Sequence, residues 1–267
     1  MSSAEHVRVA HDVLDPGQAR RLAALLGLDD VLPVDDVPPL WHWVYFLGSV
    51  PQSAIGADGH PASEVPTAPG PGFKRMFAGG RAQFHRPLRY GEPSTRRVRL
   101  LRQATKQGRS GLLTFATVEV EVLQATAVAV TEQQDIVYLR SEPAATPKRP
   151  EPSPPTTDER AVLSLDVDAT LLFRFSALTY NAHRIHYDLA YARSEGHADL
   201  VVHGPLQALL LSEATRRCRD GPLVQFDYIL RAPAYGAQKM TAYTDGAGGY
   251  VLRDGAHQMT ATATARW

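Results

Sequence analysis

The sequence predicts an α+β protein in which a helix followed by antiparallel strands occurs twice. Two stretches have helical spacing of apolar residues, one near the N-terminus and one at residues 204–218. Several segments with strand-like patterns and glycine-rich turns follow in each half. A proline-rich stretch at residues 141–160 separates the two sets. We therefore expect a long helix wrapped by a curved antiparallel sheet, made twice.

The first helix is predicted within LDPGQARRLAALLGLDD, residues 14–30. Asp15 can cap its start, Pro16 suits the first turn and Gly27 can end it. Its apolar face would comprise five residues that recur at helical spacing: Ala19, Leu22, Ala23, Leu25 and Leu26.

An aromatic run, PLWHWVYFLGSVP at residues 39–51, also has helical length, and we expect a helix closed by Gly48 and Pro51. Residues 52–72 are rich in Gly, Pro, Ala and Ser and predict a loop. A loop of this length without regular structure is often functional or mobile.

Strands are predicted next. Residues 80–92 indicate a strand with a turn at Pro87 and Gly91. Residues 111–124 alternate, with three valines on one face, and residues 125–140 indicate another strand or two. Residues 141–160, SEPAATPKRPEPSPPTTDER, predict an exposed, semi-stiff linker. The chain then divides into residues 1–140, the linker and residues 161–267.

In the second half, residues 162–179 predict a strand that leads into a polar segment. GPLQALLLSEATRRC, residues 204–218, predicts a strong helix with Pro205 in its first turn. Residues 223–236, 238–255 and 257–267 predict strands separated by Gly-rich turns. The apolar residues at helical spacing in the helix are Leu206, Leu209, Leu210 and Ala214.

Composition excludes several classes of protein. The formal net charge of the 267 residues is zero, so no field of either sign would attract nucleic acid or a membrane surface. Cys218 is the only cysteine, which rules out an intrachain disulfide and a cysteine-based zinc site. The start lacks the pattern of a secretory signal, and no apolar stretch is long enough to span a bilayer. We expect a cytoplasmic protein.

One stretch concentrates groups that can do chemistry. FSALTYNAHRIHYDLAYA, residues 175–192, contains two histidines beside an asparagine and an arginine, and LVVHGPLQ follows at residues 200–207. Together they resemble the MaoC-like hydratase/dehydratase family, in the branch of mesaconyl-CoA and itaconyl-CoA hydratases and mitochondrial 3-hydroxyacyl-thioester dehydratase type 2. RMFAGGRAQFHRPLRYGE and FDYILRAPAYG support the resemblance in the rest of the chain.

The resemblance implies a double hot-dog fold, with two antiparallel curved sheets each wrapped around a central helix. It implies catalysis in residues 161–267 and a non-catalytic, acyl-binding N-terminal half. The family motif Asp-x-Asn-Pro-Ile/Leu-His corresponds to residues 181–186, which places the catalytic histidine at His186 and Asn181 where the family has aspartate. Gly204 matches the glycine that polarises the thioester carbonyl.

The chemistry of hydration is consistent with these residues. A histidine with a pKa of roughly 6.5 suits deprotonation of water, and His186 is the candidate. Asn181 cannot shuttle a proton but can hold a water molecule. The helix start offers the N–H groups of Gly204 and Leu206 to an enolate oxygen, because Pro205 has none. We expect a hydrogen bond from His203 to position this turn.

Structural interpretations remain for most of these residues. His186 could be a satisfied core histidine, and His183 is a helper or a structural residue. Arg184 could simply pair with a surface carboxylate. Asp188 suits a turn, a helix cap or the orientation of a histidine. His183 and His186 could ligate a metal, but no third ligand lies near them in sequence, so we expect none.

Substrate contacts are harder to assign. Arg231, Arg81 and Arg75 are candidates for coenzyme A phosphates, whereas Arg174 and Arg184 flank the catalytic segment and could meet a free carboxylate bidentately. Four aromatic residues in the expected N-terminal helix would line the acyl cavity or simply pack the core: Trp41, Trp43, Tyr45 and Phe46.

We therefore predict a hydro-lyase that reversibly hydrates a 2-enoyl thioester, with a short dicarboxylic acyl-CoA as substrate. Coenzyme A would enter as part of the substrate, with no other cofactor. A carrier-protein dehydratase and a non-catalytic acyl-thioester binding protein remain alternatives. A hot-dog thioesterase is disfavoured because no carboxylate sits beside the histidine in sequence. A homodimer is possible.

Overall fold

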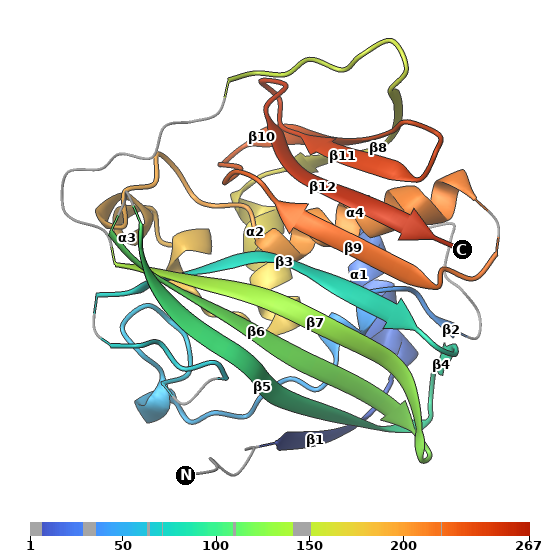
Figure 1. The fold of residues 1–267 in the computed structure, drawn as a ribbon, viewed down its shortest axis with the longest axis horizontal. Coiled ribbons are helices and arrows are strands. Elements are labelled where there is room, and N and C mark those ends of the chain that lie inside the picture. The colour runs from blue at the N-terminus through green and yellow to red at the C-terminus, as the bar shows by residue number, and fades with distance from the viewer. Residues whose placement is uncertain are drawn as a thin grey trace.

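The computed structural model describes residues 7–28, 36–62, 65–70, 72–108, 111–140, 151–219 and 221–267. Within them, a 10-stranded antiparallel sheet has the order β1-β5-β6-β7-β3-β9-β12-β11-β10-β8 (Figure 1). The N-terminal half supplies β1 (Arg8–Val13), β3 (Lys74–Phe84), β5 (Pro93–Gly108), β6 (Gly111–Gln124) and β7 (Ala127–Arg140). The C-terminal half supplies β8 (Arg160–Val167), β9 (Gln225–Leu230), β10 (Gln238–Thr244), β11 (Gly249–Arg253) and β12 (Met259–Arg266).

Shorter elements complete the described fold. The helices are α1 (Pro16–Leu26), α2 (Ala169–Thr179), α3 (Leu189–Ser194) and α4 (Gly204–Cys218). Strands β2 (Asp36–Val37) and β4 (Leu88–Arg89) form a separate pair, and 3-10 turns occur at Trp41–Val44, Gln52–Ala54 and Arg184–His186. No helix in the described ranges is long and apolar enough to cross a membrane.

The two halves share the sheet because β3 pairs with β9, from Gly79 opposite Ile229 to Gln83 opposite Gln225. The strands approach closely at two glycines. A Cβ on Gly80 would lie 2.5 Å from the Tyr228 hydroxyl oxygen and 2.7 Å from a backbone oxygen of β7. Side chains at this junction would force the halves apart.

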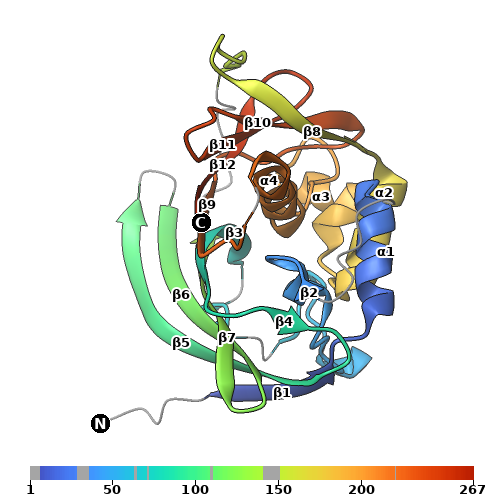
Figure 2. The ribbon, with the colours of Figure 1, turned by 90° about the vertical axis from the view of Figure 1, so that its right-hand side faces the viewer.

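Helix α4 lies against the concave side of the C-terminal strands, as Figure 2 shows. Its predicted bounds are confirmed, and all four residues of its predicted apolar stripe are buried. Helix α1 is confirmed as well. The Asp15 carboxylate accepts from the Gly17 amide at 2.9 Å, and Gly27 ends the helix at a φ of 67°. The buried residues of α1 are the five predicted ones: Ala19, Leu22, Ala23, Leu25 and Leu26.

The helix expected in residues 39–51 is wrong, because the run forms only the 3-10 turn Trp41–Val44. Leu40 and Phe46, on either side, adopt positive φ angles of 67° and 57°, which a helix cannot continue through. The indole N–H groups explain the geometry, since buried indoles need acceptors. Trp41 donates to Glu213 at 2.7 Å and Trp43 donates to Glu132 at 2.9 Å.

The aromatic residues of this segment therefore pack the core, which is the second interpretation given above. Trp41, Tyr45 and Phe46 belong to the main hydrophobic cluster, and Trp43 packs against Phe77 and Tyr228.

The strand predictions succeeded where alternation was clear. Strand β6 has the predicted bounds, and residues 125–140 form the single strand β7. Strand β5 was missed because most of its residues are exposed and arginine-rich, without an apolar stripe. The linker expectation for residues 141–150 lies outside the described residues, whereas residues 151–159 are mostly exposed, as predicted.

Candidate active site

The site begins where α2 ends. Tyr180 ends the helix in the left-handed region at a φ of 51°, and the Asn181 amide donates back to the Ser176 carbonyl at 2.8 Å. The Asn181 side-chain oxygen then accepts from the His183 amide at 3.0 Å. This local bond forms an Asx turn that reverses the chain. Asn181 is therefore a turn former. Its side-chain NH₂ group has no partner among the described residues and can hold water.

His186 lies in the next turn with its ring buried. Its Nδ1 is 2.7 Å from the Val201 carbonyl oxygen. Because a carbonyl only accepts, Nδ1 carries the proton and Nε2 carries the lone pair. Burial lowers the pKa of His186 to about 4, although the bond to Val201 opposes this. The ring is therefore neutral near pH 7, as a general base must be.

His203 supports this ring. The two imidazoles stack with centroids 3.6 Å apart and planes 19° from parallel. The expected hydrogen bond of His203 is present, between Nε2 and the Ser176 hydroxyl at 2.9 Å. His203 also occupies the position just before α4. It thereby joins α2, His186 and the start of α4.

The start of α4 can stabilise negative charge. Gly204 and Leu206 lie in the first turn, whose amides have no partner within the helix, and Gln207 donates to the His203 carbonyl at 3.2 Å. A Cβ on Gly204 would lie 2.5 Å from Leu230 Cδ1 and 3.2 Å from Phe77 Cδ1. A larger residue here would have to displace the Leu230 and Phe77 side chains. The predicted imidazole and the predicted amide pair thus lie in one place, linked by the stacked His203.

His183 is buried beside His186, with ring centroids 5.5 Å apart. Burial lowers its pKa to about 2, and the charges of His60, His186 and Arg75 act in the same direction. His183 is therefore neutral across the physiological range. A neutral His183 does not hold a proton for the reaction. It is left as a helper or as a structural residue beside His186.

Sequence reasoning missed two residues of this site, Asp58 and His60. The His60 ring lies 4.2 Å from the His183 ring, and its Nδ1 is 3.1 Å from Asp58 Oδ2. They come from the 52–72 loop, which the sequence singled out only by its length. Asp58, His60 and His183 each offer a ligand atom within 4.8 Å of the others, so this trio could hold a metal ion.

The candidate arginines lie elsewhere or have other partners. The Arg184 guanidinium forms an ion pair with Asp188 at 2.7 Å, in agreement with the interpretation that it pairs with a surface carboxylate. It also donates to the Ala57 carbonyl at 3.0 Å. Asp188 also caps α3 by accepting from the Tyr191 amide. Arg174 is exposed on α2. Arg231 comes directly after β9 and, like Ile229 two residues earlier, is exposed.

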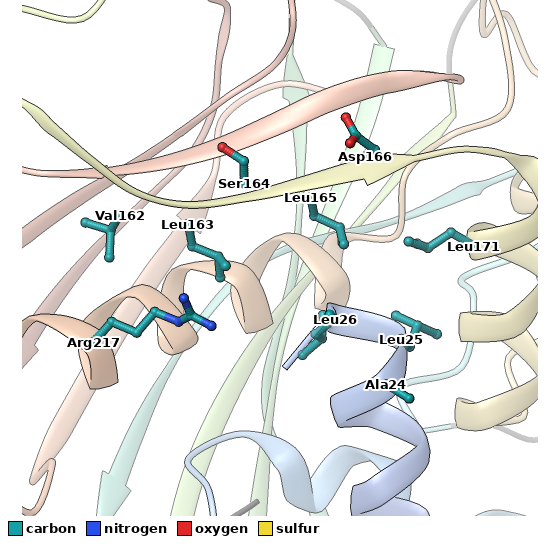
Figure 3. A pocket seen from close by; sticks show the side chains of 11 residues that line it. Ala24, Leu25, Leu26, Val162, Leu163, Ser164, Leu165, Asp166, Leu171 and Arg217 are labelled. Atoms are coloured by element: carbon teal, nitrogen blue, oxygen red, sulfur yellow. The ribbon is translucent and has the colours of Figure 1, made fainter. Parts of the chain in front are cut away.

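Two grooves lie outside this cluster. Figure 3 shows one of about 550 Å³ between α1, β8 and Arg217, and none of its lining residues is a histidine. The second, of about 720 Å³, lies between the β5–β6 strands and β9–β12, and basic residues line it. Both are separate from His186. The basic residues of the second groove are Arg81, Arg102, Lys106 and Arg231.

Comparison with known proteins identifies the family. The model of the hydroxyacyl-thioester dehydratase type 2 family matches residues 40–236. The chain belongs to this family. Mesaconyl-C(4)-CoA hydratase of Chloroflexus aurantiacus is 46% identical over 225 residues, 82% of this chain and 79% of the relative. The mitochondrial hydroxyacyl-thioester dehydratase type 2 of Schizosaccharomyces pombe is 24% identical over 233 residues, 76% of this chain and 75% of the relative.

Solved structures confirm the double hot-dog fold. HtdX of Mycobacterium tuberculosis has a TM-score of 0.69 at 19% identity, covering 98% of this chain and 99% of its own. Another M. tuberculosis protein, described as a double hot-dog, has a TM-score of 0.60 at 16% identity, covering 99% and 96%. The predicted MaoC-like family is thus confirmed, and this dehydratase-family member is a hydro-lyase of acyl thioesters.

Proposed function

We propose that the protein hydrates a short 2-enoyl-CoA carrying a second carboxyl group, of the mesaconyl type. The observation that carries this is the 46% identity to mesaconyl-C(4)-CoA hydratase over 82% of the chain. The pairing of His186 with the start of α4 supports it, because thioester hydration requires a neutral base beside amides that can donate to the thioester oxygen, and the first amides of α4 have no partner within the helix.

In the forward reaction, His186 Nε2 takes a proton from a water molecule held by the Asn181 amide. The water oxygen bonds to the β-carbon, and the double-bond electrons move toward the thioester oxygen. The amides of Gly204 and Leu206 stabilise that oxygen, an effect of about 3 kcal/mol for one donor in comparable sites. The imidazolium then returns its proton to the α-carbon. The sum is addition of one water.

Coenzyme A enters as part of the substrate, and the proposed reaction needs no metal or other cofactor. The catalytic groups belong to residues 161–267, and residues 1–140 complete the acyl pocket. We place the protein in the cytoplasm, as a possible homodimer, without nucleic-acid or membrane partners. Because Arg231 lies in the outer basic groove, a role for it in binding coenzyme A phosphates would require the nucleotide to reach that face.

The test is to incubate the purified protein with mesaconyl-CoA and with crotonyl-CoA and to follow loss of the enoyl-thioester absorbance. We expect loss with mesaconyl-CoA and no free thiol. Thiol release would indicate a thioesterase. Binding without turnover would indicate an acyl-thioester binding protein. Faster dehydration of a 3-hydroxyacyl carrier protein would favour the carrier-protein alternative.

A further inference from the structure

The turn at residues 55–61 comes from the N-terminal half and lies against the catalytic segment. The Arg184 amide donates to the Asp58 carbonyl at 2.9 Å, and the Arg184 guanidinium donates to the Ala57 carbonyl at 3.0 Å. An antiparallel bridge between the first and last residues of the turn closes it. These bonds hold the turn in one place beside Arg184.

Gly59, in the middle of the turn, makes this close approach possible. It adopts a φ of 96°, which disfavours other residues, and a Cβ there would overlap the Ala182 carbonyl oxygen and lie 3.2 Å from the His183 Cα. The side chains on either side of Gly59 are those of Asp58 and His60. The approach of the two backbones therefore brings these side chains to His183.

Three potential metal ligands meet at this contact. Asp58, His60 and His183 each offer one atom, and the three atoms lie within 4.8 Å of one another. Two imidazoles and one carboxylate are a ligand set of zinc and similar divalent ions, whereas Mg²⁺ and Ca²⁺ prefer oxygen ligands. The sequence predicted no metal because no third ligand lies near His183 and His186 in the chain. The fold supplies two ligands for His183 from the other half of the molecule.

The His183 ring is buried at this contact without a hydrogen bond. The residue is only 8% exposed, and neither ring nitrogen has a hydrogen-bond partner among the residues that the structure describes. Buried polar groups are nearly always paired, so a buried imidazole without a bond calls for a partner that the chain does not supply. One of these nitrogens is the atom that lies within 4.8 Å of the ligand atoms of Asp58 and His60. A metal ion bound between the three residues would satisfy it.

The Asp58 carboxylate is oriented for this role. Its Oδ1 accepts from the His60 amide at 3.0 Å, and its Oδ2 lies 3.1 Å from His60 Nδ1. With metal–ligand bonds of about 2.0–2.2 Å, two ligand atoms of a tetrahedral ion lie about 3.4 Å apart. The separation of Oδ2 and Nδ1 is therefore close to that of two ligands of one ion. The bond from the His60 amide to Oδ1 would keep the carboxylate in place, as the outer hydrogen bonds of metal sites do.

We propose that Asp58, His60 and His183 bind one divalent ion of the zinc type, which joins the N-terminal turn to the catalytic segment. Three protein ligands leave a further coordination position open for water or an anionic group. The site is a neighbour of the proposed base, since the rings of His183 and His186 lie 5.5 Å apart, but no step of the proposed hydration passes through it. The inference goes beyond the proposed function and does not depend on it.

The experiment titrates Zn²⁺ into the metal-free, full-length protein by isothermal calorimetry. We expect one equivalent to bind to the wild type. His60→Gln and His183→Gln each remove one ligand and should weaken binding by about 100-fold or more, because even residues that only support a ligand contribute about 10–100-fold to affinity. His85→Gln is the matched control, because His85 is exposed and bonds only to Thr131 in the described part of the chain. It should bind Zn²⁺ as tightly as the wild type.

Co²⁺ gives a second readout, because its visible absorption reports the ligands and geometry of its site. Asp58 is partly exposed, so Asp58→Asn should fold, which circular dichroism would check, and should lose the Co²⁺ spectrum of the wild type.

Two results would overturn the proposal: no Zn²⁺ binding by the wild type, or binding that is unchanged in both His60→Gln and Asp58→Asn. Titration of His186→Ala keeps the two inferences apart, because this variant should bind Zn²⁺ like the wild type. A wild-type protein that binds Zn²⁺ through the three residues but does not hydrate mesaconyl-CoA would refute the proposed function and support the metal site.

Discussion

Each half of the molecule buries a cluster of polar side chains, and the two clusters differ in how their hydrogen bonds are used. In the N-terminal half, Glu132 is fully buried and accepts from Tyr228 at 3.0 Å, from Trp43 at 2.9 Å and from His42 at 3.1 Å. In the C-terminal half, the stacked rings of His186 and His203 each use one ring nitrogen within the described residues. His203 Nδ1 is buried there without a partner.

The difference separates a structural cluster from a reactive one. A buried polar group that is fully hydrogen-bonded rigidifies a core, whereas an unsatisfied one costs stability and calls for another explanation. The Glu132 cluster joins the 3-10 turn to β7 and β9 and so holds the halves together. His186 and His203, whose pKa values are lowered by burial, keep neutral ring nitrogens beside the start of α4, which suits proton transfer.

The strongest test of this contrast is His186→Ala. Removing the base should lower kcat by about 10²–10⁴-fold. The free energy of unfolding should also fall, by about 2–4 kcal/mol, because the buried ring leaves a cavity and the Val201 carbonyl loses its donor. Steady-state hydration and chemical denaturation would measure the two effects. His85→Ala is the control. Full activity in His186→Ala would refute its assignment as base.

Glu132→Gln should lower stability with little change in kcat. The new amide nitrogen would face donors from Trp43, His42 or Tyr228, and we expect a loss of about 3–5 kcal/mol in the free energy of unfolding. Tryptophan fluorescence during denaturation would measure it. The opposite finding, a stable protein that has lost turnover, would mean that the Glu132 cluster belongs to catalysis.

Low pH should destabilise the protein through the Glu132 cluster. Burial alone would raise the pKa of Glu132. The bonds from His42 and Trp43 outweigh burial and lower this pKa below the ordinary value of 4.5. The folded state therefore holds this proton less tightly than the unfolded chain. The stabilisation by Glu132 is complete above pH 4.5 and is lost as pH falls through the folded-state pKa. Denaturation measured across this window should show a weaker pH dependence in Glu132→Gln than in wild type.

The sequence predicted those elements of the fold whose conformation depends on residues close to one another in the chain. The caps and apolar stripe of α1 and the bounds of α4 and β6 all lie within short segments whose residues act on one another. The prediction of a helix in the aromatic run was wrong because the conformation of this run depends on hydrogen-bond acceptors at Glu132 and Glu213, which lie far away in sequence. Asp58 and His60 were missed for the same reason, since only the folded chain brings them to His183.

Asn181→Ala should give the smallest effect, because asparagine contributes neutral hydrogen bonds. Loss of one such bond to water, about 1 kcal/mol, corresponds to a fall in kcat of roughly five- to ten-fold. The variant also loses the acceptor for the His183 amide. Asn181→Asp retains that acceptor and restores the carboxylate of the family motif, so it separates turn formation from water binding. If Asn181→Asp recovers the turn but not the rate, the amide NH₂ is the group that holds water. If Asn181→Ala costs more than His186→Ala, the residue does more than hold water, and the division between a reactive imidazole and its supports would have to be redrawn.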